Sequence, residues 1–163
     1  FISYSKIMSE QELSISKYNL IIHESDLPKG KGFSPMTWQI LKNKNKIKIN
    51  LFEATTEVDS GNILLSDTIV LKDDDLFFDW RKKQALATIK LCEKFLNSKK
   101  IKPIPQKGKE TFYRKRKKED SEINPNRSII SQFNLLRVVD NENYPAFFIH
   151  NNKKYILKIF KDD

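Results

Sequence analysis

The sequence predicts an α/β fold, and three observations indicate it. The run 18–22 is mostly apolar and ends abruptly in a polar loop with Gly and Pro, which is typical of a buried strand. Residues 47–51 alternate apolar with polar side chains, which is the period of a half-buried strand. An apolar stripe then recurs at helical spacing, formed by Ala85, Ile89, Cys92 and Leu96.

The first strand leads through a loop into a predicted helix. Ser34 offers a hydroxyl as N-cap, and Pro35 suits the first helical position because its fixed φ is already helical. We expect this helix to end near Lys42, with Trp38 and Leu41 facing inward.

Two further strands and a long helix are predicted next. The polar loop 55–61 separates the strand at 47–51 from a second apolar stretch at 63–71. The acidic residues at 73–75 favour the start of a helix, because carboxylates stabilise the amide donors and the dipole there. We therefore expect an amphipathic helix over about 76–97 that carries the apolar stripe.

The segment 99–110 is polar and basic, and its prolines and glycine prevent a continuous helix. We interpret it as a linker between a domain over 1–98 and a smaller domain over 111–163. In the second domain we expect a helix over 129–138, followed by a β-hairpin. The hairpin turn is Asn151-Asn152, since asparagine tolerates the positive φ of tight turns, and the adjacent His150 should be exposed.

Composition excludes several classes of protein. No apolar run approaches the roughly 18 to 20 residues of a membrane span, and the opening residues lack the features of a signal peptide, so we expect a cytoplasmic protein without membrane contacts. Cys92 is the single cysteine, and the two histidines lie far apart. We therefore expect neither an internal disulfide nor a metal site. The chain opens on Phe1 rather than Met, which indicates that it begins inside a larger protein.

The net charge of +9 is concentrated in the C-terminal part. Residues 1–98 carry 14 Lys and Arg against 13 Asp and Glu, whereas residues 99–163 carry 16 against 8. Such a region can bind RNA or a diphosphate-linked substrate, and a merely solvated lysine-rich surface is the alternative. The same two interpretations apply to the dense basic run 113–118. Arg137 is expected to pair with an acidic neighbour such as Asp140.

Two polar segments are candidates for catalysis. His23 follows the first apolar strand, and open α/β sheets bind ligands at the carboxyl ends of their strands. Its alternative role is only to hydrogen-bond the next loop. Asp59 lies in the loop between two strands, from which it can reach a neighbouring imidazole, although Asp-Ser-Gly is also an ordinary turn sequence.

Two motifs in this order carry a family resemblance. The segment 23–35 reads His-Glu-Ser-Asp-Leu-Pro, a basic Gly-rich loop and Ser-Pro, and 58–61 reads Val-Asp-Ser-Gly. Both are similar to the catalytic signature of the folate-dependent formyltransferases, which include methionyl-tRNA formyltransferase and the sugar N-formyltransferases. Segments 132–137 and 144–148 resemble the family's small second domain. The resemblance implies a partial Rossmann-like formyltransferase domain that lacks its N-terminal half, followed by a small OB-like β-rich domain.

The resemblance also implies a reaction, the transfer of a formyl group from N10-formyltetrahydrofolate to an amine. The amine nitrogen attacks the formyl carbon, so a base must accept its proton while a donor stabilises the oxyanion. His23 would be the base, and Asp59 would orient its ring and stabilise the imidazolium. The folate would be bordered by Ser25, Leu27, Pro28, Gly32, Glu57, Val58 and Gly61.

The sequence departs from the family pattern at two points. Ile21 stands where the family places an asparagine as oxyanion donor. Asn19 is a poor substitute, because residues four apart in a strand are separated by about 13 Å, so Ser25 or a backbone amide are the alternatives. The family's opening strand-helix-strand unit is missing as well, and we expect the chain alone to be inactive or unstable.

Three functions remain open. The motifs Ser-Asp-Leu-Pro and Lys-Gly-Lys-Gly favour a nucleotide-linked amino sugar as the acceptor, as in surface polysaccharide biosynthesis. The basic C-terminal region instead suits methionyl-tRNA as the acceptor. A function of another class is a non-catalytic OB-like module that grips RNA by cations and aromatic rings. The residues that could stack on bases are Tyr144, Phe147, Phe148 and Tyr155. Alternation along the strands instead places most of these rings in the core.

Overall fold

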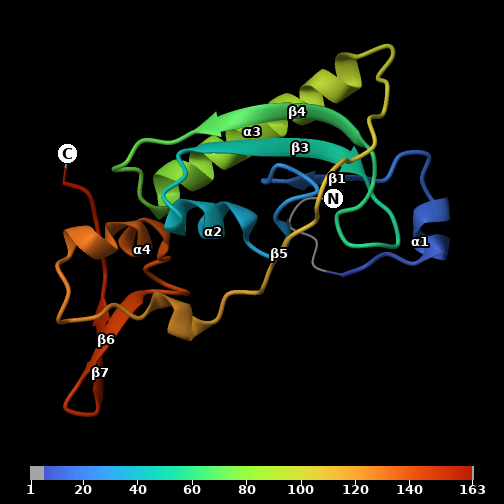
Figure 1. Ribbon diagram of the computed structural model, residues 1–163. Coiled ribbons are helices and arrows are strands. Elements are labelled where there is room, and N and C mark those ends of the chain that lie inside the picture. Colours follow the sequence, from blue (N-terminus) through green and yellow to red (C-terminus); the bar gives the residue numbers. More distant parts are fainter. Residues whose placement is uncertain (1–5, 163) are drawn as a thin grey trace.

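The computed structural model describes residues 6–162 (Figure 1). Its largest sheet is antiparallel with the order β1-β3-β4, formed by Leu20–His23, Lys46–Glu53 and Ile63–Val70. The predicted strands are therefore confirmed, although β1 begins two residues later and ends one residue later than expected. The opening at Phe1 lies outside the described residues.

A short helix that was not predicted, α1 (Glu10–Ser14), precedes β1. Ser9 and Glu12 form a capping box, in which the Ser9 hydroxyl accepts from the Glu12 amide and the Glu12 carboxylate accepts from the Ser9 amide. Asn19 closes this turn, because its Nδ2 donates to the carbonyls of Leu13 (2.6 Å) and Ser16 (3.1 Å).

Both helices of the first half form where expected, but they bury other side chains. In α2 (Pro35–Leu41), Met36 and Ile40 are buried, whereas Trp38 and Leu41 are only half-buried. Ser34 begins this helix in the left-handed conformation, and its hydroxyl makes no cap bond.

The predicted stripe on α3 (Phe77–Asn97) is wrong. Trp80, Thr88 and Leu91 are its buried residues, whereas Ile89 is 53% and Leu96 79% exposed. The helix carries apolar residues on more than one face, so periodicity alone does not decide which face meets the sheet. The buried face packs with α2 and the sheet in one core, which contains Met36, Ile40, Ile47, Ile49, Leu51, Ile69, Leu71, Trp80, Leu91 and Val138.

The segment expected to be a linker runs along the first half (Figure 1). Ile104 forms an isolated antiparallel bridge with Ile63. Further along, β5 (Phe112–Tyr113) pairs in parallel with β2 (Lys31–Gly32), the strand that follows the His23 loop. Residues placed beyond the predicted domain boundary therefore complete a sheet of the first half.

The C-terminal part contains η1 (Lys118–Ser121), then η2 (Ile130–Gln132) and α4 (Phe133–Val138) in place of the single helix predicted over 129–138. The hairpin of β6 (Ala146–His150) and β7 (Lys153–Leu157) is confirmed. Asn151 and Asn152 have φ of 48° and 59°, and His150 is exposed. Within residues 114–162 this hairpin is the sheet that the structure shows.

Arg137 joins the two parts, and its expected pairing with Asp140 is wrong. The fully buried guanidinium donates to the carbonyls of Lys72 and Asp75 and to the side-chain oxygens of Asn45 and Asn134. The carbonyl of Arg137 in turn accepts from the Trp80 indole at 2.9 Å. Among residues 6–162, no helix is long and apolar enough to cross a membrane.

Candidate active site

His23 is the last residue of β1, and only 6% of it is exposed. Its neighbour across the sheet is Asn50 on β3. The ring nitrogen Nε2 lies 2.8 Å from the carbonyl oxygen of Gly30. Gly30 adopts a φ of +75°, which favours glycine and turns the loop back toward β1.

Asp59 reaches the same imidazole from the loop between β3 and β4. Its Oδ2 lies 3.6 Å from His23 Nδ1 and accepts a hydrogen bond from the Gly32 amide at 2.8 Å. Asp59 has a left-handed φ of 47°, a conformation that aspartate tolerates better than most residues. The structure therefore brings together the two side chains that the motifs single out.

The two ring nitrogens of His23 have different surroundings. A neutral imidazole carries one hydrogen, and the contact with the Gly30 carbonyl is short enough for a hydrogen bond, so we assign that hydrogen to Nε2. The gap of 3.6 Å to Asp59 is longer than a hydrogen bond. The lone pair of Nδ1 then faces the neighbouring Asp59 carboxylate.

The residues predicted to border the folate fall into two groups. Ser25, Leu27 and Pro28 are buried in the loop after β1, and Gly32 is half-buried. Glu57 and Val58 are exposed at the tip of the other loop.

Gly61 is held by close backbone packing. A Cβ added there would lie 1.8 Å from the Glu53 carbonyl oxygen, so only glycine fits. Ser25 is 1% exposed, and its hydroxyl has no hydrogen-bond partner within the described part of the chain. An orphaned buried hydroxyl is unusual and is a candidate contact for a bound group.

Ile21 and Asn19 do not supply a donor at the site. Ile21 pairs with Phe52 in the sheet and is half-buried. The amide group of Asn19 is occupied by the carbonyls that close α1. The prediction that Asn19 is a poor substitute is therefore confirmed.

Sequence reasoning missed Asn50 and Lys31. Asn50 was assigned to the polar face of a half-buried strand, yet it is fully buried, donates to the Ser25 carbonyl at 2.6 Å and accepts from the Ser66 hydroxyl. Lys31 is 1% exposed, and its ammonium donates to the hydroxyl of Ser60 and the carboxylate of Glu110. Asn50 occupies a polar position in an alternating strand pattern, and Lys31 lies in a basic loop. Neither residue therefore stands out in the sequence.

The basic run 113–118 and the aromatic residues of the C-terminal part make contacts of their own. Arg114 is paired with Asp120 through both guanidinium nitrogens, at 2.7 and 2.5 Å. Phe147 is buried, while Phe148 stacks on Tyr155 with the ring centroids 5.2 Å apart. Tyr144 and Tyr155 are exposed, so the expectation that most of these rings lie in the core is wrong.

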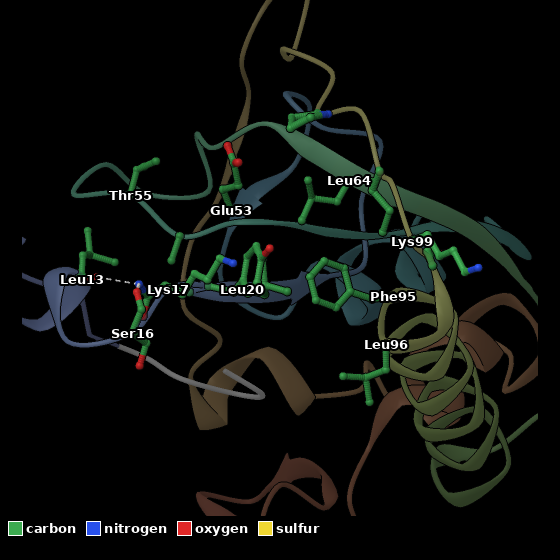
Figure 2. A pocket seen from close by; sticks show the side chains of 16 residues that line it. Leu13, Ser16, Lys17, Leu20, Glu53, Thr55, Leu64, Phe95, Leu96 and Lys99 are labelled. Atoms are coloured by element: carbon green, nitrogen blue, oxygen red, sulfur yellow. Dashed lines mark hydrogen bonds between the residues drawn. The ribbon is translucent and has the colours of Figure 1, made fainter.

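A cavity of about 670 Å³ opens at the other end of β1 (Figure 2). Its wall includes Leu20, Glu53 and Phe95, and neither His23 nor Asp59 belongs to it. No group of three or more His, Cys, Asp or Glu with the geometry of a metal site occurs in residues 6–162.

Relatives are found by sequence, although no family model matches the chain. A methionyl-tRNA formyltransferase from Thermodesulfovibrio yellowstonii is 30% identical over 140 residues, which cover 83% of this chain and 46% of that protein. The bifunctional polymyxin resistance protein ArnA from Wigglesworthia glossinidia brevipalpis is 30% identical over 165 residues, or 94% of this chain and 24% of that protein. The chain thus spans less than half the length of these curated relatives.

Solved structures show the same fold. The methionyl-tRNA formyltransferase from Clostridium thermocellum has a TM-score of 0.81 at 23% identity, covering 98% of this chain and 70% of that one. A 4-N formyltransferase from Francisella tularensis gives 0.74 at 17% identity, covering 99% and 69%. HypX from Aquifex aeolicus in complex with tetrahydrofolic acid gives 0.71 at 18% identity, covering 97% and 28%. This chain is thus similar in sequence to a methionyl-tRNA formyltransferase and to ArnA, and it shares its fold with solved formyltransferases.

Proposed function

We propose that the protein transfers a formyl group from N10-formyltetrahydrofolate to the amine of a nucleotide-linked amino sugar. The observation that carries the proposal is the convergence of His23 Nδ1 and Asp59 Oδ2, 3.6 Å apart, at the carboxyl end of β1. The domain division at 99–110, with a partial Rossmann-like domain before it and an OB-like domain after it, is part of the same proposal.

In this mechanism, a neutral primary amine donates one N–H to His23 Nδ1 and the other to Asp59 Oδ2. Its nitrogen attacks the formyl carbon of the donor, and the carbonyl oxygen becomes an oxyanion. Nδ1 accepts a proton from the amine, and Asp59 stabilises the imidazolium that results. The tetrahedral intermediate then expels N10 of tetrahydrofolate, which takes up a proton, and leaves a formamide on the sugar.

The oxyanion needs a donor that Ile21 cannot provide. We assign this role to the Ser25 hydroxyl, because it is buried beside the Gly30 turn and has no partner in the described part of the chain. A preorganised donor of this kind contributes about 10²- to 10³-fold to kcat. Ser25→Ala should therefore lower kcat by that range, and Ser25→Thr should retain part of it.

The folate would lie against the two loops that flank the pair. We assign its borders to Leu27, Pro28 and Gly32 on one side and to Glu57, Val58 and Gly61 on the other. Support comes from the HypX structure, which shares the fold and contains tetrahydrofolic acid.

The second candidate acceptor is methionyl-tRNA, favoured by the relative from T. yellowstonii and by the excess of cations over 99–163. Incubating the protein with both acceptors and a formyl donor radiolabelled in the formyl group distinguishes the two. We expect label to appear in nucleotide-linked amino sugars. Label in charged tRNA alone would refute the sugar acceptor, and label in neither would refute formyl transfer. RNA retention without any transfer would indicate the binding module instead.

A further inference from the structure

The segment 104–113, which we call the strap, passes over both loops that carry the catalytic pair. We propose that the strap is a positioning element of the active site, in which Gln106 fixes the Asp59 loop and Thr111 fixes the turn that orients His23. The inference rests on the proposed function for its kinetic consequences, and its structural part is testable without it.

At one end, the strap holds the backbone on both sides of Ser60. The Gln106 amide nitrogen donates to the carbonyls of Asp59 (2.8 Å) and Gly61 (2.9 Å). Ile104 anchors this end, because its amide and carbonyl each bond to Ile63 at 2.8 Å. The loop that presents the Asp59 carboxylate is therefore clamped by a side chain from outside the sheet.

At the other end, the strap reaches His23 through Gly30. The hydroxyl of Thr111 accepts from the Gly30 amide at 2.8 Å, and the carbonyl of Thr111 accepts from the Lys31 amide at 2.9 Å. Gly30 then offers its own carbonyl to His23 Nε2 at 2.8 Å. Its Cα lies against Tyr113, since an added Cβ would be 2.7 Å from that ring. The orientation of the imidazole thus depends on where the strap holds the turn.

The Lys31 side chain links the Asp59 loop to the strap. Its buried ammonium donates to Ser60 of the Asp59 loop at 2.8 Å and to Glu110 of the strap at 2.5 Å. A buried ammonium is costly unless it is paired, so the ion pair with Glu110 stabilises the contact between the strap and the loops. Both loops and the strap therefore form one hydrogen-bonded unit around the catalytic pair.

The strap side chains position rather than react, because their contacts are to backbone groups and to Lys31. Each such hydrogen bond contributes only modestly to stability. Displacing a catalytic group by about 1 Å, however, can cost on the order of 10²-fold in rate. The expected signature is a fall in kcat with little change in the KM of the formyl donor.

The kinetic test compares Gln106→Ala and Thr111→Val with matched control variants. Each variant should lower kcat about 10-fold while KM changes less than about 2-fold. Thr111→Ser, which keeps the accepting hydroxyl, should restore kcat. The controls are Gln11→Ala on α1 and Thr68→Val, exposed on β4, and both should leave kcat unchanged. Wild-type kcat in both strap variants would overturn the proposal.

A spectroscopic test keeps the inference separate from the proposed function. The chain contains two histidines, so the ring-nitrogen signals of His23 are read by NMR with exposed His150 as internal reference. Thr111→Val should shift the His23 signals and Thr111→Ser should not, while those of His150 stay constant. Shifted His23 signals in a protein without transferase activity would uphold the positioning role and refute the proposed function. Unshifted signals would overturn the positioning role itself.

Discussion

The sheet region and the C-terminal part differ in how their structure is maintained. The β1-β3-β4 sheet and its helices share one continuous core, whereas the core of the C-terminal part comprises only Ile123, Leu136, Val139 and Ala146, with partly buried neighbours. Because buried apolar area is the main stabilising contribution, the first region should be rigid and the second should depend on its junction with it. His23 and Asp59 lie in the first region, whereas the excess of 16 cations over 8 anions in residues 99–163 is shared between the segment 99–113, which contains the strap, and the C-terminal part.

The two histidines, one in each region, give the largest expected contrast. His23→Ala removes the proposed base, so formyl transfer should fall by about 10²- to 10⁴-fold. His150→Ala removes an exposed side chain on β6 and should leave transfer unchanged. The rate of label transfer measures both. Equal losses in the two variants would contradict the division of roles.

The two cores can be compared by removing one buried isoleucine from each. Ile49→Ala should lower the free energy of unfolding by about 4 kcal/mol, because the site is fully buried in the large core. Ile123→Ala should cost about 2 kcal/mol, since the small core leaves its residues freer to close the cavity. Urea denaturation measures the difference, and a larger loss for Ile123→Ala would reverse our ranking of the regions.

The junction itself is tested at Arg137. Arg137→Met leaves the carbonyls of Lys72 and Asp75 without their donor and should lower the free energy of unfolding by about 3 kcal/mol. The matched variant Arg127→Met, at an exposed position, should change it by less than about 0.5 kcal/mol. Amide hydrogen exchange should show the C-terminal part opening first in Arg137→Met. Unchanged protection there would indicate that the junction does not support it.

The smallest effect concerns acid pH. The Arg114 guanidinium lowers the pKa of Asp120 from 3.8 to about 2. Because the folded pKa is depressed, the stabilisation is fully present above pH 3.8 and is lost as the pH falls through about 2. The pair is partly exposed, so its contribution is at most about 1 kcal/mol. Urea midpoints of wild type and Asp120→Asn should converge as the pH falls from 4 to 2, and parallel curves would contradict the assignment.

Much of the fold is predictable because it depends on local patterns. The alternation around Ile47, the proline at position 35 and the Asn151-Asn152 turn each predict an element that the structure contains. Local patterns do not show which face of a helix or strand is buried. Ile89 belongs to an apolar stripe of α3 that faces outward, and Asn50 occupies a polar position of β3 that is buried. Tertiary packing decides the burial of both residues.

The site is predictable where a motif defines it and hidden where distant segments meet. His23 and Asp59 stand out by their motifs and do converge. Gln106 and Thr111 lie in a segment whose composition indicates a linker, and their contacts with the catalytic loops span more than 40 residues of sequence. Hydrogen bonds to backbone carbonyls and amides carry no signal in a single sequence.

The central claim is that His23 and Asp59 act as one catalytic unit, and a double-mutant cycle tests it most directly. His23→Ala, Asp59→Asn and the double variant are compared with wild type by the rate of formyl transfer. Side chains that act as a unit are strongly non-additive, so the double variant should be about as slow as His23→Ala alone. If the two losses multiply, the side chains act independently and the proposed mechanism is wrong.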